Sequence, residues 1–137
     1  MKKLIIAAAF ILFTGVAFGQ TLNKGSLLGV HNVTVTLNSG ITMDQYIEFT
    51  TDKMIPAVEK NFAGVKFFVM KGVRGENENG IAFLWFFKTV KDRDIYFTAE
   101  GGLTEKGMAA QVNLQPLIEE GSKLGSYTTT HTDWIIQ

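Results

Sequence analysis

The stretch GIAFLWFFK at residues 80–88 constrains the fold most strongly, because it is apolar at almost every position. In an extended strand, alternate side chains point to opposite faces of the sheet. One face would then carry Ile81, Phe83, Trp85 and Phe87, and the other Ala82, Leu84 and Phe86. A strand with one face in water alternates apolar and polar residues. Both faces of this strand must therefore be covered.

The chain divides into strands and helices in the order β-α-β-β-α-β. Clusters of β-branched and aromatic residues predict strands at 27–37, 65–73, 81–88 and 127–137. Apolar residues at helical spacing predict helices at 43–62 and 104–123, with a short helical turn at 90–97. Thr42 with Gln45, and Thr89 with Asp92, have the spacing of helix caps.

Each long predicted helix contains a proline, in the similar segments IPAVEK and QPLIEE. A proline inside a helix removes a hydrogen bond and bends the helix. The similarity fits two related β-α-β halves, and it also fits coincidence in a six-residue match.

Right-handed β-α-β connections place both helices on one face of the sheet. With the strand order 4-1-3-2, the chain is predicted to be an α+β protein with a ferredoxin-like antiparallel sheet. The other face of strand 81–88 then stays bare, and an apolar face of that size is unfavourable in water. We therefore predict a homodimer in which the same face of a second copy covers it.

The first 19 residues have the plan of a bacterial signal peptide: two lysines, an apolar run, and small residues Ala17 and Gly19 before Gln20. The run at 4–18 is shorter than the roughly 20 residues that span a bilayer. The alternative is a retained membrane anchor. We predict a mature domain at 20–137 that is exported to the periplasm or secreted, with no membrane association after cleavage.

Charge and cysteine content exclude several classes of function. Removal of Lys2 and Lys3 changes 13 basic against 13 acidic residues to 11 against 13, and no basic patch suggests nucleic acid. The absence of cysteine excludes disulfides, thiolate catalysis and sulfur-ligated metals. Stability must come from packing, which the 11 phenylalanines can supply.

The chain resembles the dimeric α/β-barrel superfamily, which includes antibiotic-biosynthesis monooxygenases, NIPSNAP proteins and stress-responsive barrel domains. The residues that carry the resemblance are HNVTVTL at 31–37, MIPAVEKNFAGVKFF at 54–68 and the aromatic strand 81–88. The resemblance implies a dimeric α/β barrel built on residues 27–137. Haem-degrading members use a histidine on the second helix, and 104–123 contains none, so no cofactor is predicted.

His31 and His131 are the only histidines, and they lie on strands predicted to be neighbours. Such a pair could act as general acid and base near neutral pH, and the resemblance to members that catalyse cyclisation permits this role. The alternative is that each histidine is a hydrogen-bonded structural residue. The strand register, which decides whether the two rings meet, does not follow from the sequence.

The cofactor-free monooxygenases of the superfamily surround an aromatic substrate with Asn, Trp and Tyr. The resemblance implies a catalytic role for Asn32 and a substrate-binding role for Trp85, to which we add Tyr46 and Asp133. Trp85 could equally be a core aromatic residue. Two histidines and a carboxylate can bind a divalent metal, but nothing in the sequence makes His31, His131 and Asp133 converge, so no metal site is predicted.

Three functions remain open at this point. The first is a cofactor-independent oxygenase, isomerase or cyclase acting on a small aromatic or apolar compound. The second is a protein that binds such a ligand without converting it. The third is a stress-related structural dimer with a filled core. A cavity above roughly 300 Å³ with a histidine on its wall favours the first two.

Overall fold

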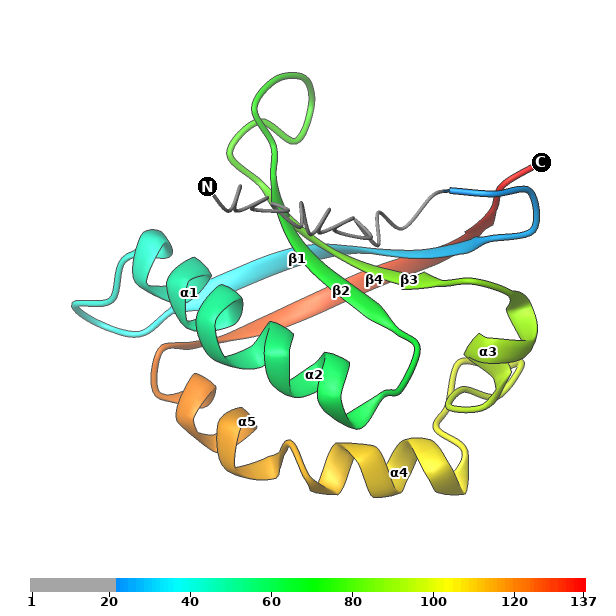
Figure 1. The fold of residues 1–137 in the computed structure, drawn as a ribbon. Helices are drawn as coiled ribbons and strands as arrows, with labels where there is room; N and C mark the ends of the chain where they lie inside the picture. The colour runs from blue at the N-terminus through cyan, green and yellow to red at the C-terminus, as the bar shows by residue number, and fades with distance from the viewer. Residues whose placement is uncertain (1–21) are drawn as a thin grey trace, which may run out of the picture.

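The structure, a computed structural model, describes residues 22–137. A four-stranded antiparallel sheet forms its centre, built from β1 Leu27–Leu37, β2 Lys66–Lys71, β3 Ile81–Phe87 and β4 Gly125–Ile135. The helices lie together on one side of this sheet (Figure 1). The predicted signal peptide at 1–19 lies outside the described residues. Within 22–137, no helix is both long and apolar enough to cross a membrane.

The strands are arranged in the order β2-β3-β1-β4, and every neighbouring pair is antiparallel. This is the predicted order 4-1-3-2 counted from the other edge, so the α+β ferredoxin-like prediction is confirmed. Residues directly opposite each other share a face of the sheet. Leu28 pairs with Phe86 and Trp134, and Phe68 pairs with Leu84. Even-numbered strand residues therefore form one face, here called the outer face, and odd-numbered ones form the helix-side face.

The first helical segment begins at the predicted position but is not a regular α-helix throughout. It consists of α1 Met43–Phe49, a π-helix η1 Thr50–Met54 and α2 Ile55–Asn61. The capping box of Thr42 and Gln45 is present and confirms that prediction. Pro56 lacks an N–H, and it lies in the first turn of α2, directly after the π-helix. The wider π turn thus absorbs the proline without ending the helix.

The prediction of one helix over 104–123 is wrong, because Pro116 divides it. The connection from β3 to β4 contains α3 Val90–Asp94, α4 Glu105–Val112 and α5 Gln115–Ser122. Pro116 lies in the first turn of α5, where its missing N–H costs nothing, whereas an unbroken helix would need that donor. The predicted cap of α3 is confirmed, because the Asp92 N–H donates to the Thr89 hydroxyl.

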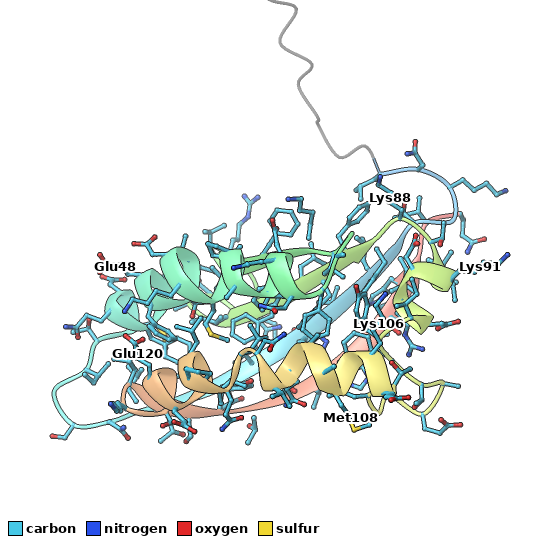
Figure 2. All side chains as sticks on the ribbon, turned by 60° about the horizontal axis from the view of Figure 1, so that its bottom comes forward. Glu48, Lys88, Lys91, Lys106, Met108 and Glu120 are labelled. Carbon is cyan, nitrogen blue, oxygen red and sulfur yellow. The ribbon has the colours of Figure 1, made fainter. Side chains whose placement is uncertain are left out.

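The hydrophobic core lies between the helix-side face and the helices. Its buried side chains come from all parts of the chain, including Phe67, Phe83 and Phe87 of the sheet and Tyr46, Val58, Phe62, Ala110 and Leu114 of the helical segments. Charged side chains such as Glu48, Lys88 and Lys91 point outward (Figure 2). The prediction that helices cover one face of β3 is therefore confirmed.

The outer face is apolar along β2 and β3 and rich in threonine along β4. Phe68 is 44% exposed and Trp134 is 58% exposed, whereas Phe86 is buried. None of the helices in residues 22–137 lies on this face (Figure 1). The described chain thus leaves a large apolar surface in contact with water.

The hairpin at 72–80, between β2 and β3, extends away from the helices (Figure 1). Its base is tight, because a Cβ added to Gly72 would lie 1.9 Å from the Asn77 carbonyl oxygen. Asn79 has a φ of 64°, in the left-handed region that tight turns require. The hairpin and the outer face together border a hollow of about 510 Å³.

Candidate functional site

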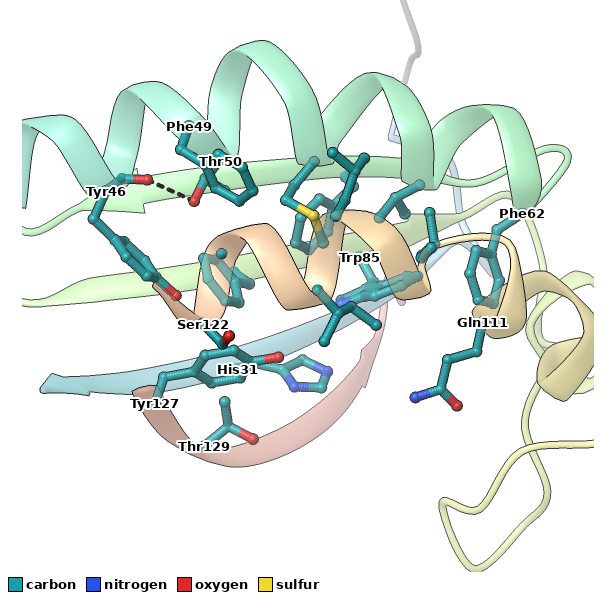
Figure 3. Close-up of a pocket in the computed structure, with 18 of the residues that line it drawn as sticks. His31, Tyr46, Phe49, Thr50, Phe62, Trp85, Gln111, Ser122, Tyr127 and Thr129 are labelled. Carbon is teal, nitrogen blue, oxygen red and sulfur yellow. Dashed lines mark hydrogen bonds between the residues drawn. The ribbon is translucent and has the colours of Figure 1, made fainter. Parts of the chain in front are cut away.

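A cavity of about 520 Å³ lies between the helix-side face and the two helical segments. The sheet contributes residues from all four strands, such as His31, Phe67, Trp85 and Tyr127. The helices contribute residues from α1, η1, α2, α4 and α5, such as Tyr46, Phe49, Met54, Gln111 and Ile118. Figure 3 shows His31, Tyr46, Phe49, Trp85 and Tyr127 around a common space. A volume of this size is typical of sites for small organic molecules.

The cavity has no charged wall. None of the residues that line it is Asp, Glu, Lys or Arg; its polar members are His31, Tyr46, Thr50, Gln111, Ser122, Ser126, Tyr127 and Thr129. The Thr50 hydroxyl is already engaged, because it donates to the Tyr46 carbonyl oxygen at 2.8 Å (Figure 3). The other walls are aliphatic and aromatic. The site therefore suits apolar molecules with few polar groups.

The two histidines meet. His31 and His131 are directly opposite each other on β1 and β4, and their rings stack with centroids 5.1 Å apart and planes inclined by 20°. His31 lines the cavity and lies 6.5 Å from the Trp85 ring, centroid to centroid. His131 is exposed and does not line the cavity, but its ring contacts the ring of His31.

The environment of His31 favours its neutral form. Burial lowers the pKa of His31 below its ordinary value of 6.5, the neighbouring His131 lowers it further, and Asp133 partly opposes both effects. A neutral imidazole can accept a proton at one nitrogen while it donates a hydrogen bond from the other. His31 thus has the protonation state that a general base requires at neutral pH.

Asp133 lies on the same face as His131, as alternation predicts, but its ion pair is with Arg93. The Arg93 Nη2 atom lies 3.2 Å from Asp133 Oδ2, and Arg93 Nη1 donates to the Thr98 carbonyl oxygen at 2.9 Å. Gly29 makes room for this carboxylate, since a Cβ there would lie 3.2 Å from Asp133 Oδ1. The structure therefore places Asp133 at the edge of the site, where it ties α3 to the sheet.

Two tyrosines form the polar end of the cavity with His31. Tyr46 of α1 is only 5% exposed, and burial followed by the nearby Tyr127 raises its pKa to about 12. Tyr127 of β4 packs edge-on against Phe83 with ring centroids 5.9 Å apart. Figure 3 shows Tyr46, Tyr127, His31 and Thr129 on the same side of the cavity. Each phenol hydroxyl can donate a hydrogen bond.

Trp85 is both a core residue and a cavity wall. Its ring lies 4.9 Å from that of Phe67, 5.4 Å from Phe62 and 5.7 Å from Phe97, centroid to centroid. Such edge-to-face and tilted contacts hold an indole rigidly. Trp85 can therefore be a core aromatic residue and also be available to contact a molecule in the cavity, so the two interpretations from the sequence are compatible.

Asn32 does not join the other candidates. It lies on the outer face, beside Ala82 and Thr130 in the sheet, and it borders the hollow near the hairpin.

Tyr127, Phe62 and Gln111 line the cavity but were not identified as site residues from the sequence. Tyr127 alternates with Thr129 and His131, and this pattern could have identified it.

Among residues 22–137, no group of three or more His, Asp or Glu side chains is arranged to hold a metal ion. His31, His131 and Asp133 are neighbours in the sheet, but Asp133 is paired with Arg93.

No protein-family profile and no curated protein matches the sequence. Among solved structures, a NIPSNAP family protein of unknown function from Agrobacterium tumefaciens matches with a TM-score of 0.52 at 12% identity, over 82% of this chain and 91% of that one. An uncharacterised NIPSNAP-like domain protein from Burkholderia xenovorans matches with a TM-score of 0.54 at 8% identity, over 84% and 88%. A dimeric protein of unknown function and ferredoxin-like fold from Bacteroides fragilis matches with a TM-score of 0.44 at 15% identity, over 82% and 98%.

The two NIPSNAP-type matches extend over most of both chains, and identities this low establish the fold alone. The chain therefore has the ferredoxin-like fold of NIPSNAP-type domains.

Proposed function

We propose that this protein binds a small apolar or aromatic molecule in the cavity between its sheet and its helices. The observation that carries the proposal is a cavity of about 520 Å³, walled by aromatic and aliphatic side chains and bordered by His31. A structural dimer with a filled core needs no such space, because protein interiors are otherwise packed to high density.

Quenching of Trp85 fluorescence tests this proposal. The chain contains two tryptophans, and the Trp134→Phe variant leaves Trp85 as the only reporter. A small aromatic probe such as naphthol should quench or shift its emission in a saturable manner. The matched variant Trp85→Phe retains Trp134 on the outer face and should show no saturable change. Equal responses in the two variants would contradict binding in the cavity.

A second candidate is a cofactor-independent enzyme in which His31 moves a proton of the bound molecule. The position of His31 on the cavity wall and its lowered pKa favour this function. Deuterium exchange into β-tetralone, an enolisable ketone of suitable size, tests it by NMR in D₂O. His31 would take the α-proton to leave an enolate, which regains a deuteron from solvent. Exchange that is as fast in His31→Gln as in the wild type would exclude this role.

We also propose that the protein is a homodimer joined through the outer face, as in a dimeric α/β barrel. The even-numbered strand positions carry Phe68, Met70, Leu84 and Trp134 toward water. Their only charged residue, Lys66, is paired with Glu59 of α2. A two-fold axis through this face would bury the patch against its own copy. The hollow beside the 72–80 hairpin gives room for the partner's side chains.

Sedimentation velocity tests the dimer with two matched variants. Leu84→Glu places a charge in the middle of the outer face, and Val112→Glu places one on α4, where Val112 is 70% exposed. The wild type and Val112→Glu should sediment as dimers, and Leu84→Glu as a monomer or as aggregates. A folded, dimeric Leu84→Glu protein would exclude the outer face as the interface.

We also propose that the protein is exported, and the tripartite pattern of residues 1–19 supports this. Expression of the full chain in a bacterium followed by fractionation tests it. The periplasm or medium should contain a product whose N-terminal residue is Gln20. An intact N-terminus on all of the cellular protein would contradict cleavage at this site.

A further inference from the structure

The polarity of the cavity also restricts the chemical class of the ligand, provided that the proposed binding function is correct. A charged ligand loses its hydration on entering an apolar cavity and needs a counterion there. The lining residues of this cavity include none. An ionised carboxylate, phosphate or amine is therefore a poor ligand for this site.

Two cations on elements that surround the cavity are paired with carboxylates. At one edge Arg93 is paired with Asp133 and Asp94. Between the two helical segments, Lys53 is paired with Glu120. Neither cation can turn toward a bound anion without giving up its carboxylate partner.

The polar groups of the cavity are not spread evenly. Tyr46, Tyr127 and His31 lie toward one end, Phe62 and the single amide of Gln111 lie toward the other, and Trp85 lies between them (Figure 3). Within residues 22–137, the Tyr46 and Tyr127 hydroxyls form no hydrogen bond with another group, and both residues line the cavity. These phenols are donors that a ligand oxygen could use.

We propose that the ligand is uncharged and amphipathic, with a ring or chain packed against Phe62, Phe67 and Trp85 and a hydroxyl or carbonyl oxygen that hydrogen-bonds with Tyr46, Tyr127 or His31. The apolar part supplies most of the affinity, because burial of apolar surface is the main favourable contribution. The single polar oxygen fixes the orientation of the molecule in the cavity.

Three probes with the same ring system test this inference by the fluorescence of Trp85 in the Trp134→Phe variant: naphthalene, naphthol and naphthoate. At neutral pH naphthol should bind about fivefold more tightly than naphthalene, which is the effect of about one hydrogen bond. It should bind at least about tenfold more tightly than naphthoate, whose charge finds no partner.

The double variant Tyr46→Phe/Tyr127→Phe identifies the source of the preference. Its affinity for naphthalene should match that of the parent, while its affinity for naphthol should fall by about fivefold. A preference for naphthol that survives in this variant and in His31→Phe would overturn the assignment of the polar end.

The outcomes separate the two proposals. If the probes bind but naphthoate binds as tightly as naphthol, the uncharged class is wrong and the cavity proposal stands. If none of the three probes binds, both proposals fail.

Discussion

The buried phenol of Tyr46 makes the stability of the protein depend on alkaline pH in a predictable way. Its pKa in the folded protein is raised to about 12 from the ordinary value of 10.0. Because of this higher pKa, Tyr46 ionises at a lower pH in the unfolded chain than in the folded protein. The contribution of the protonated Tyr46 phenol to the free energy of unfolding is therefore fully present below about pH 10, and it is lost as the pH rises toward about 12.

The magnitude follows from the shift. The rise in the pKa of Tyr46 from 10.0 to about 12 corresponds to about 2.7 kcal/mol of stability, of which about 1.4 kcal/mol is lost by about pH 11. These values are upper bounds, because the Tyr46 side chain borders the cavity and water there would stabilise the phenolate. The Tyr46→Phe variant removes the titrating group and should change stability little at neutral pH.

Urea unfolding at a fixed protein concentration measures the effect as the difference between wild type and Tyr46→Phe. The contributions of ionisable groups far from Tyr46 cancel in this difference. Tyr46→Phe should gain stability over the wild type by roughly 1 kcal/mol between about pH 9 and about pH 11. A difference that stays constant with pH would show that the phenol of Tyr46 is not shielded from water, and would refute the reasoning.

Three further perturbations have defined outcomes. Phe62→Ala should reduce the free energy of unfolding by about 3 kcal/mol, near the lower end for buried phenylalanines because the void joins an existing cavity, whereas Val112→Ala at an exposed position should change it by less than about 0.5 kcal/mol in the same urea titration. Gly107→Ala should destabilise the protein although alanine ordinarily favours a helix, because the new Cβ would lie 2.2 Å from the Tyr96 carbonyl oxygen; a higher urea midpoint would contradict this packing. The lowered pKa of His31 means that the unfolded chain binds its proton first, so stability should fall as the pH drops below 6.5. His31→Gln should lose part of that dependence, and imidazole NMR signals should show one histidine titrating below its ordinary range.

The topology was predictable because its signals are local. The β-branched segment at 27–37 and the two-sided apolar strand at 81–88 have few alternatives to a sheet, and Thr42 and Thr89 mark helix starts by hydrogen bonds within one turn. The backbone around the two prolines could not be predicted from the neighbouring residues. Pro56 follows a π turn within a continuous helical segment, whereas Pro116 lies in the first turn of a separate helix, although the flanking segments look alike.

The site was less predictable because it depends on distances between elements. Alternation places His31 and His131 on the same face, but only the register of β1 against β4 makes them directly opposite. The cavity lies between the sheet and the helices, and its volume depends on packing between segments far apart in sequence. Asn32 shows the converse, because the alternation that places His31 inside necessarily places Asn32 on the outer face.

The location of a bound molecule is the most direct test of the proposed function. Backbone amide NMR shifts of the isotope-labelled protein, recorded during titration with naphthol, report that location residue by residue. The cavity proposal predicts saturable shifts that concentrate at His31, Phe67, Trp85 and Tyr127, together with α1 and α5. Shifts confined to the outer face around Met70 and Leu84, or no saturable shifts, would contradict it.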